Sequence, residues 1–379
     1  MKVLLLLTSM PGFTGKGFSS FSAKYIEGLV EKGVEVDIVR IRSMHPARRL
    51  RRTIQLWNGQ EMHELSILLP RNIFGFTFPS FLFRRQMNKL GLVYDVVHAG
   101  NGWLAIAASI ASKLRSVNYI VQFIGNDANI DLPIMIRNHT YTKAIAGAKM
   151  LSFNSQGLHN VFEQAVSPMN VPKSVVRRGV NLREAEYCFE LSNEIRIVFL
   201  GGVPSGNEKG FFTLLKAINL LNYVKLEKHV KFMIGGPQTL RFRDSIVSLN
   251  PKITLEFVGE LPHANVIEVL RHSHVVLIPS LQEGIPNLLY ESMATGNLVI
   301  ASNVGGIPEI LQDAVSGWLV PPNDEKSLAR AIKRVLENDR EMEEFATHGR
   351  RIVENYGYDR FIDSYLRIYA SICGTSTNS

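Results

Sequence analysis

Two glutamates flank a short turn after an apolar run, in the stretch LQEGIPNLLYESMATGN. Glu283 and Glu291 are eight positions apart, with Gly284, Pro286 and Asn287 between them. The preceding run VVLIPS has the character of a buried strand. Because the fixed φ of Pro286 suits the start of a helix, we expect a helix over Asn287–Ala294 that carries Asn287 and Glu291 on one face. Glu283 then lies in the loop above that helix, and the two carboxylates are placed to hold different parts of a ligand.

The predicted helix also offers unpaired N–H groups between the two glutamates. The first N–H groups of a helix have no partner within the helix and can receive an anion. Here they belong to Asn287, Leu288 and Leu289. A carboxylate accepts hydrogen bonds from two adjacent hydroxyls, as in a ribose or a sugar ring. Each glutamate taken alone could be an ordinary solvated side chain, but together the pattern suits a nucleotide sugar, with hydroxyls at both ends and phosphates between them.

Two further loops contain residue types that suit a phosphate. MPGFTGKGFSS places Gly15 and Gly17 before a predicted helix, where the backbone can approach a ligand closely. The loop lacks the spacing of a Walker sequence or a dinucleotide fingerprint, so a plain strand-to-helix turn is the alternative. In GGVPSGNEKGFFTLL, Lys209 stands directly before a predicted helix. A cation there opposes the helix dipole unless an anion binds beside it, although a lysine pointing to water is the alternative.

These loops follow strand-like runs in two successive series of alternating strands and helices. The first series runs from KVLLLLT to AKMLSFN, and the second from IRIVFLGG to SGWLVPP. Continuous apolar runs separated by helical segments are typical of parallel strands buried on both faces. We therefore predict an α/β protein of two Rossmann-like, doubly wound domains that face a cleft, with ligands beyond the carboxyl ends of the strands.

The polar stretch LREAEYCFELSNE, residues 182–194, separates the two series and is predicted to be a linker. We expect a first, acceptor-binding domain over residues 1–183 and a second, donor-binding domain over residues 184–357. The tail has a break at the sequence Tyr-Gly-Tyr and then a helical pattern. We expect this last segment, residues 358–379, to pack back on the first domain.

The formal net charge of +8 is unevenly spread along the 379 residues. Residues 1–190 hold 23 Lys and Arg against 13 Asp and Glu, whereas residues 191–379 hold 19 against 21. Six arginines and no acid lie between Arg40 and Arg52. Such a segment can bind phosphates, nucleic acid or an anionic membrane surface, and a solvated loop is the alternative. The aromatic residues that bind single-stranded nucleic acid are absent from the segment, so we expect no nucleic-acid partner, and an anionic membrane surface and a solvated loop both stay open.

Other features of the sequence exclude several classes of protein. No apolar run reaches the roughly 18 residues of a membrane span, and the apolar core at residues 3–7 is too short for a signal peptide. Two cysteines, Cys188 and Cys373, make no disulfide framework, so we expect a cytoplasmic protein. His272 and His274 have no matching third ligand, and we predict no metal site.

The run from Phe257 to Asp324 resembles the retaining glycosyltransferases of the GT-B fold, family 4. Glu283 and Glu291 match the acids of the family signature, and the sequence continues as SMATGNLVIASNVGGIPEILQDAVSGWLVPPND. The remainder of the chain resembles the family more loosely. The resemblance implies transfer of a sugar from a nucleotide sugar, such as a UDP- or GDP-sugar, with retention at the anomeric carbon and without a metal or other cofactor. The leaving phosphate would itself take the acceptor's proton, so no side-chain base is required.

The resemblance also implies roles for individual residues. Glu291 would hold the ribose hydroxyls, Glu283 the hydroxyls of the donor sugar, and Lys209 the diphosphate. Base contacts in such folds are largely made by the backbone of loops like the one that contains Gly236. The remaining donor contacts that it implies are Gly15, Gly17, Gly284, Pro286, Asn287 and Leu288. With the basic first half of the chain, it suggests a glycan or lipid-linked acceptor at the inner membrane face, in the synthesis of a polysaccharide or glycolipid.

Two positions depart from the family pattern. Gly202 stands where the family usually has an arginine, so a cation is missing there. Ile124 stands where the family often has a histidine, in the segment Phe-Ile-Gly-Asn-Asp. Asp127 in that segment is a candidate for the acceptor side of the catalytic site or for loop structure, and His98 could partly replace the histidine. These departures leave a non-catalytic relative as one alternative, and a nucleotide-sugar epimerase on the same fold as another.

Overall fold

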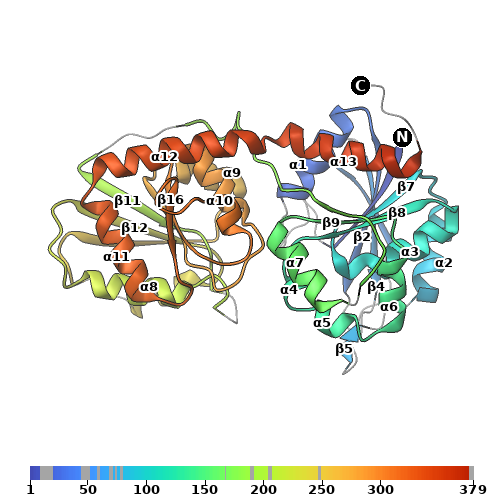
Figure 1. Cartoon of the computed structure of the whole chain (residues 1–379), viewed down its shortest axis with the longest axis horizontal. Coiled ribbons are helices and arrows are strands. Elements are labelled where there is room, and N and C mark those ends of the chain that lie inside the picture. Colours follow the sequence, from blue (N-terminus) through green and yellow to red (C-terminus); the bar gives the residue numbers. More distant parts are fainter. Residues whose placement is uncertain are drawn as a thin grey trace. The chain divides into compact units, whose positions relative to one another are not determined.

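The computed structural model describes residues 1–8, 20–43, 52–57, 60–67, 71–72, 75–76, 80–166, 168–187, 192–203, 207–245 and 249–374. The chain divides into two compact units (Figure 1). The first unit consists of Met1–Arg177 and Asp359–Ser379, and the second of Arg178–Tyr358. Both units are α/β, as the alternating sequence pattern predicts.

The first unit is built on an eight-stranded sheet in the order β10-β9-β8-β7-β1-β2-β4-β3. Only the pairing of β3 with β4 is antiparallel among these described strands. The strands are β1 (Lys2–Leu7), β2 (Glu35–Ser43), β3 (Arg52–Trp57), β4 (Gln60–Ile67), β7 (Val96–Ala99), β8 (Asn118–Phe123), β9 (Met150–Phe153) and β10 (Lys173–Val175). Two short strands, β5 (Arg71–Asn72) and β6 (Gly75–Phe76), pair separately.

Helices cover both faces of this sheet. Figure 1 shows α1 and α13 on one face, and α2, α3 and α6 on the other. The apolar side chains of β1, α2, α3, α6 and α7 form one core cluster. The helices are α1 (Ser20–Glu31), α2 (Ser80–Leu90), α3 (Ala105–Arg115), α4 (Asn126–Asn129), α5 (Leu132–Met135), α6 (His139–Ala146), α7 (Gln156–Ala165) and α13 (Tyr358–Cys373), with the 3₁₀ turn η1 (Gly102–Leu104).

The second unit is built on a six-stranded parallel sheet in the order β13-β12-β11-β14-β15-β16. The strands are β11 (Glu194–Phe199), β12 (His229–Gly235), β13 (Ile253–Gly259), β14 (Val275–Ile278), β15 (Leu298–Ser302) and β16 (Gly317–Val320). The helices are α8 (Phe211–Leu221), α9 (His263–Arg271), α10 (Asn287–Thr295), α11 (Glu325–Leu336) and α12 (Asp339–Val353), with the 3₁₀ turns η2 (Thr239–Ser245), η3 (Ile307–Glu309) and η4 (Glu354–Tyr356). Two apolar clusters, one with α8 and α11 and the other with α9 and α10, cover the sheet.

Each of the two large sheets has one point at which the order of its described strands reverses. In the second unit the chain builds outward from β11 to β13 and then returns to place β14 on the other side of β11. In the first unit β1 lies between β2 and β7 in the same way. The loops after the two strands at such a switch point diverge and leave a crevice at the carboxyl edge, where open α/β sheets bind ligands. The loops after β11 and β14, and those after β1 and β7, are therefore where chemistry is expected.

The strands with continuous apolar sequences are buried as predicted. Residues Val3–Leu7 of β1 and all four residues of β14 are buried, since helices lie on both faces of each sheet. The hairpin β3–β4 was not predicted from the sequence. Its strands, RTIQLW and QEMHELSI, mix polar and apolar residues, and β3 is an antiparallel edge strand rather than a buried parallel one. This mixed pattern is a weak strand signal, and it directly follows the arginine-rich segment that was predicted to be a loop.

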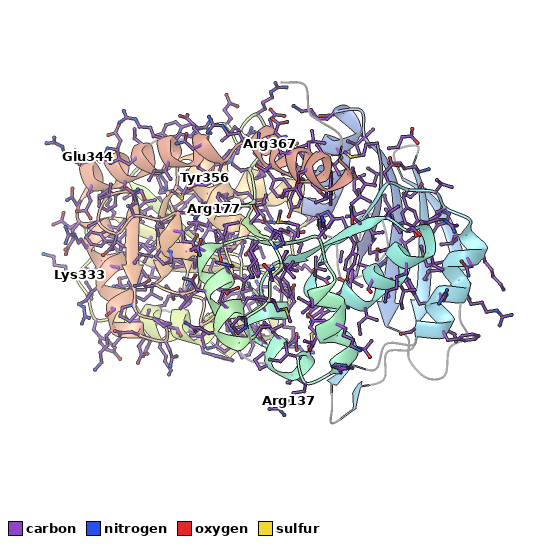
Figure 2. All side chains as sticks on the ribbon, turned by 45° about the vertical axis from the view of Figure 1, so that its right-hand side comes forward. Arg137, Arg177, Lys333, Glu344, Tyr356 and Arg367 are labelled. Carbon is purple, nitrogen blue, oxygen red and sulfur yellow. The ribbon has the colours of Figure 1, made fainter. Side chains whose placement is uncertain are left out.

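The described first part of the predicted linker, residues 182–187, belongs to the second unit. Val180, just before it, donates its N–H to Tyr356 O at 2.9 Å and accepts one from Tyr358 at 3.1 Å. Ala185 is fully buried in the apolar cluster of α9 and α10. Tyr356, labelled in Figure 2, packs against Tyr290 with ring centroids 5.6 Å apart. These contacts explain why the chain leaves the first unit after Arg177 rather than within the polar stretch.

Helix α13 is fixed to the first unit by a buried polar cluster. The hydroxyls of Tyr25 and Tyr369 are 2.5 Å apart, and His98 Nδ1 is 2.6 Å from Tyr369 Oη. Burial disfavours the charged imidazole and lowers the pKa of His98 to about 3. A Cβ on Gly28 of α1 would lie 2.8 Å from Ile362 of α13, so the two helices approach closely. His98, which the sequence offered as a replacement for the missing histidine, therefore has a structural role.

Candidate functional site

The loops after β11 and β14 meet at the switch point of the second unit. Lys209, just before α8, forms an ion pair between its Nζ and Glu283 Oε1. Ser280 Oγ donates a hydrogen bond to the same carboxylate oxygen at 3.1 Å. The Glu283 side chain is only 11% exposed, whereas that of Lys209 is 38% exposed. The structure thus brings together two residues that lie 74 positions apart in the sequence and that were each predicted for the donor site.

The described backbone next to Lys209 lies in close contact with the loop after β14. Leu281 N donates to Glu208 O at 2.8 Å. Gly210 has a φ of +70°, and a Cβ there would lie 1.8 Å from Pro279 O, so only glycine fits. The ammonium and the carboxylate are therefore held by backbone contacts as well as by their own attraction.

A third loop, after β15, supports Glu283 from the other side. Gly306 N donates to Gly284 O at 2.7 Å. Gly305 has a φ of +56°, and a Cβ there would lie 1.9 Å from the carbonyl oxygen of Glu283. The glycine pair in SNVGGIPEI thus serves to let this loop lie against the backbone of Glu283. It fixes the position from which the carboxylate projects.

Helix α10 begins at Asn287, next to Glu283 and as the sequence predicts. Pro286 precedes the helix in an extended conformation and provides no side-chain cap. The first N–H groups of the helix, from Asn287 and Leu288, are therefore available to an anion. Glu291 follows one turn later, half-buried on the same helix. The arrangement places a carboxylate, a helix N-terminus and a second carboxylate in succession, each supplied by the predicted residue.

Arg178, which is not among the predicted donor contacts, adds a cation to this helix N-terminus. Its Nη1 donates to Asn287 Oδ1 at 3.1 Å, across 109 positions of sequence. A cation at a helix N-terminus opposes the helix dipole, which makes an anionic ligand the natural third member of the group. The available signal was the pair of adjacent arginines in VVRRGVN. It was counted in the charge of the first half but not linked to the donor site.

The structure explains why position 202 is a glycine. Its φ is +67°, and a Cβ would lie 2.7 Å from Pro237 Cδ. Gly236, predicted for base contacts, has a φ of +116° and a Cβ there would lie 2.3 Å from Gly202 N. Val203 N donates to Pro237 O at 2.8 Å. The loops after β11 and β12 therefore cross with no space for a side chain at either glycine, so an arginine at position 202 would require a different path of the chain.

Asp127 of the first unit is enclosed by backbone donors. Its carboxylate accepts N–H groups from Gly102 and Gly125, each at 2.8 Å, and from Ile124 at 3.1 Å. The side chain is 2% exposed, and burial raises its pKa while these N–H groups lower it. These contacts favour the loop-structure alternative, and direct participation in catalysis stays a prediction.

Several residues singled out from the sequence lie outside the described residues. Gly15 and Gly17 are among them, as are Arg48, Arg49 and Arg51 of the arginine-rich segment. Arg40, at the start of that segment, is 7% exposed and donates from Nε to Thr8 O at 3.4 Å. Arg40 therefore does not contribute to an exposed basic surface.

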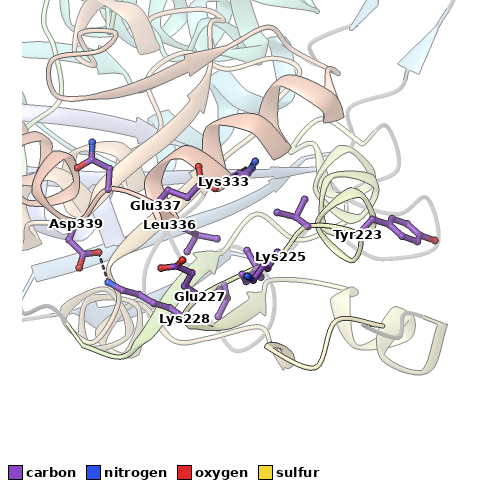
Figure 3. Close-up of a pocket in the computed structure, with 12 residues that line it drawn as sticks. Tyr223, Lys225, Glu227, Lys228, Lys333, Leu336, Glu337 and Asp339 are labelled. Atoms are coloured by element: carbon purple, nitrogen blue, oxygen red, sulfur yellow. Dashed lines mark hydrogen bonds and ion pairs between the residues drawn. The ribbon is translucent and has the colours of Figure 1, made fainter.

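A separate hollow of about 920 Å³ lies at the amino end of β12, away from the predicted donor residues (Figure 3). It is lined by Tyr223, Val224, Lys225, Leu226, Glu227, Lys228, Val230, Lys333, Leu336, Glu337, Asn338 and Asp339. Two of its lysines are paired with carboxylates, Lys228 with Asp339 and Lys333 with Glu337. Ligands of open α/β sheets bind at the opposite, carboxyl edge, so the hollow is not part of the candidate site.

Two negative findings concern the part of the chain that the structure describes. There, no group of three or more His, Cys, Asp or Glu side chains is arranged to hold a metal ion. His274 is buried instead, and its Nδ1 accepts the N–H of Arg196 at 3.0 Å. Within the same residues, no helix combines the length and the apolar character needed to span a membrane.

Comparison with known proteins identifies a family that this chain matches. Residues 192–352 match the model of the glycosyl transferases group 1. The amylovoran biosynthesis glycosyltransferase AmsK of Erwinia amylovora is 34% identical over 308 residues, which cover 73% of each chain. The putative teichuronic acid biosynthesis glycosyltransferase TuaC of Bacillus subtilis is 24% identical over 365 residues, covering 88% of this chain and 89% of that protein.

A solved structure extends the likeness to the whole chain. The Anabaena protein HepE in complex with UDP aligns with a TM-score of 0.74 at 15% identity, covering 98% of this chain and 100% of that one. With the two Rossmann-like units described above, this likeness confirms the predicted GT-B fold.

Proposed function

The chain belongs to the glycosyl transferases group 1, and on that premise we propose that it transfers a sugar from a nucleotide sugar to a glycan or lipid-linked acceptor. The relatives AmsK and TuaC are named for the biosynthesis of amylovoran and of teichuronic acid. These names support a role in the synthesis of a cell-surface polysaccharide or glycolipid. HepE was solved with UDP and also with UDP-glucose, which supports a uridine nucleotide as the first donor to test.

The Lys209–Glu283 ion pair beside the N-terminus of α10 is the observation that carries the proposal. A donor that enters this site brings a diphosphate and sugar hydroxyls. Lys209 then binds the diphosphate instead of Glu283, and Glu283 binds the hydroxyls instead of Lys209. Glu283 then holds the donor sugar, and Glu291 holds the ribose one turn along α10. The ion pair keeps both groups neutralised until the donor arrives.

In the proposed reaction the bond between the anomeric carbon and the phosphate oxygen breaks, and negative charge develops on the departing diphosphate. Lys209 and the free N–H groups of α10 are fixed beside that charge and stabilise it without reorganisation. The acceptor hydroxyl attacks from the face that the phosphate leaves, and its proton passes to a phosphate oxygen. The sugar is thus transferred with retention, and no side-chain base is needed.

Arg178 is the proposed source of the second cation. The crossing of the loops at Gly202 and Gly236 excludes an arginine at the usual family position. Arg178 reaches the same helix N-terminus from the segment after β10 and bonds Asn287 there. Its guanidinium can bind a phosphate through two parallel hydrogen bonds, which an ammonium cannot. With two cations and a helix N-terminus, the proposed site neutralises the diphosphate without a bound metal.

A binding screen followed by two substitutions tests the proposed function. UDP-, GDP- and ADP-sugars are first compared by thermal shift, because a ligand that binds the folded state raises the melting temperature. With the best donor, Glu283→Ala should mainly lower kcat, whereas Glu291→Ala should mainly weaken nucleotide binding. Glu344→Ala, on the exposed surface of α12, is the matched control.

The outcomes separate this proposal from its alternatives. Wild-type kinetics in both variants would contradict the assignment of the site. Binding of a nucleotide sugar without any turnover would favour a non-catalytic partner, and release of an epimerised nucleotide sugar would favour an epimerase. Retention and independence from metal are tested separately, by the anomeric signal of the first product in NMR spectra and by activity in the presence of EDTA.

We also propose that the protein works in the cytoplasm as a peripheral protein on the inner membrane face. The support is the excess of basic residues in the first half of the chain and the exposed positions of Arg84, Arg85 and Lys89 on α2. Clusters of Lys and Arg on a protein surface attract anionic lipids. Sedimentation with vesicles of phosphatidylglycerol and phosphatidylcholine tests the proposal. Binding should increase with the anionic lipid and decrease with salt, and equal binding to both lipids would contradict it.

A further inference from the structure

The switch point of the first unit is built from three hydrogen bonds that cross between loops. Asn101 Nδ2, after β7, donates to Thr8 Oγ1, after β1, at 2.9 Å. Gly102 N donates to Asp127 Oδ2 at 2.8 Å. Trp103 Nε1 donates to Asp131 Oδ2 at 3.1 Å. The loop after β7 is thus fixed on both sides, by the loop after β1 and by the segment after β8.

Gly102 shows how closely this loop is packed. A Cβ there would lie 2.5 Å from the Phe123 ring and 3.3 Å from Asp127 Oδ2. The backbone before Trp103 therefore has no freedom to move towards the sheet. The two aspartates, four positions apart, hold consecutive residues: Asp127 binds the N–H of Gly102, and Asp131 binds the indole of Trp103.

The result is an aromatic ring that is held in place and still open to a ligand. Trp103 is 38% exposed although its indole N–H is bonded. Ile130 and Ile134, which flank Asp131 in the sequence, are 41% and 46% exposed. Hydrophobic residues exposed singly are common on protein surfaces. What sets Trp103 apart is that its ring is oriented by a carboxylate at the edge of the sheet where ligands bind.

A pyranose ring is the ligand whose chemistry fits this combination. One face of a sugar ring presents C–H groups, which pack on an indole, while its rim presents hydroxyls. A carboxylate oxygen that accepts one N–H has capacity to accept a hydroxyl as well. A hydrocarbon chain would place apolar atoms against the Asp131 carboxylate, which is unfavourable. A diphosphate would be repelled by the same charge.

We propose that Trp103 is the platform on which a sugar ring of the acceptor stacks, with Asp131 as its positioning residue. The inference rests on the proposed function, because it assigns the acceptor side of that reaction. Asp127 acts one step further back, by holding the backbone of Gly102. The acceptor is therefore a glycan, or the sugar part of a glycolipid, that meets the protein through a ring face.

Transfer and donor hydrolysis measured on the same variants test the inference. Hydrolysis of the donor by water needs only the donor site, whereas transfer also needs the acceptor site. Methyl glycosides of glucose, galactose, mannose and N-acetylglucosamine serve as acceptor probes. Trp103→Ala should raise the KM for the glycoside at least tenfold and leave donor hydrolysis within twofold of wild type. Trp103→Phe, which keeps a ring, should retain transfer within about threefold.

Matched substitutions distinguish the platform from a general structural effect. Asp131→Ala should raise the acceptor KM with little change in kcat, and Asp131→Asn should restore it because the amide oxygen still accepts the indole N–H. Tyr223→Ala removes an aromatic ring that is 78% exposed in the other unit, and it should change neither activity. Thermal melting of each variant identifies any loss of folding.

Direct binding keeps the inference open to contradiction even if no glycoside is a good acceptor. Saturation-transfer NMR should show contact between wild-type protein and the ring protons of a glycoside, and no contact in Trp103→Ala. Absence of contact in the wild type would overturn the inference, as would equal loss of transfer and hydrolysis in Trp103→Ala. If the wild type neither binds nor hydrolyses any donor, the proposed function itself has failed.

Discussion

The two units contain the same topological feature with opposite chemistry. At the switch point of the second unit, an ammonium and a carboxylate face each other beside a helix N-terminus, and Arg178 adds a further cation. At the switch point of the first unit, Asp127 is enclosed by N–H groups and the ring of Trp103 is exposed. The difference shows that the fold supplies the place for a ligand, while the side chains decide which ligand it is.

The two crevices also differ in what makes them rigid. In the second unit, Gly210 and Gly305 allow loop backbones to pack in direct contact, and these contacts fix the backbone next to Lys209 and at Glu283. In the first unit, side-chain carboxylates bind the backbone and the indole of a neighbouring loop. The proposed diphosphate site thus depends on glycines, and the proposed site for a sugar ring depends on Asp127, which is buried, and on Asp131, which is partly exposed.

Removal of the ammonium of the donor site should have the largest effect. Lys209→Ala should lower the rate of donor hydrolysis by about 10²–10³-fold, the range seen when one group that stabilises developing charge is removed. Lys209→Arg should recover part of the rate. Lys216→Ala removes an exposed lysine further along α8 and is the control. A rate for Lys209→Ala within a factor of three of wild type would contradict the role of the ion pair.

Loss of the close contact between Gly210 and Pro279 should have the next largest effect. Gly210→Ala should lower the free energy of unfolding by about 3 kcal/mol, because the left-handed backbone and the contact with Pro279 O both oppose a side chain. Gly33→Ala is the matched control: its φ is +77°, but no atom lies within 4 Å of the added Cβ. It should cost about 1 kcal/mol. Equal urea midpoints for the two variants would show that the contact between Gly210 and Pro279 does not contribute to stability.

Acid should weaken the first unit through His98. Its folded-state pKa of about 3 lies below the ordinary value of 6.5, so the unfolded chain takes up a proton that the folded chain does not. The stability that neutral His98 contributes is present in full above pH 6.5 and is lost as the pH falls towards 3. The free energy of unfolding should therefore fall by at most about 1.4 kcal/mol per pH unit because of this group. Urea unfolding between pH 7 and pH 5 measures the slope, which His98→Gln should reduce. An unchanged slope in that variant would exclude His98 as its source.

The smallest expected effect concerns the added cation of the donor site. Arg178→Ala should raise the KM for the donor about tenfold, as expected for the loss of one charge-assisted hydrogen bond. Arg178→Lys should recover only part, because the ammonium lacks the planar fork. Arg177→Ala removes the same charge one position earlier and is the control (Figure 2). An equal KM in the two alanine variants would assign the effect to net charge alone.

The sequence predicted those parts of the molecule that depend on local pattern. Continuous apolar runs identified the buried parallel strands, and Pro286 identified the start of α10. The hairpin β3–β4 was missed because its strands have a mixed polar pattern. Glu283 and Lys209 were each found from their loops, but their contact depends on the order of β11 and β14 in the sheet.

Contacts between distant segments explain the remaining differences. Arg178 reaches Asn287 across 109 positions, and Trp103 is oriented by an aspartate from the next strand's loop. The pair of adjacent arginines is a weak local signal for Arg178, and no local signal marks Trp103. Gly202 was interpreted as the loss of a cation, because the crossing with Gly236 that requires a glycine is visible only in three dimensions. The position of His98 at a strand end made it a candidate for the site, but in the structure it is buried against Tyr369 and helps to hold α13.

Calorimetric titration with UDP, GDP and ADP at fixed ionic strength tests the central claim most directly, namely that the charged switch point holds the nucleotide and the aromatic one does not. For the nucleotide that binds wild-type protein most tightly, Lys209→Ala should raise Kd at least tenfold, and Trp103→Ala should leave Kd within twofold. Equal affinity of Lys209→Ala and wild type, or a loss of affinity in Trp103→Ala of the same size, would contradict the account.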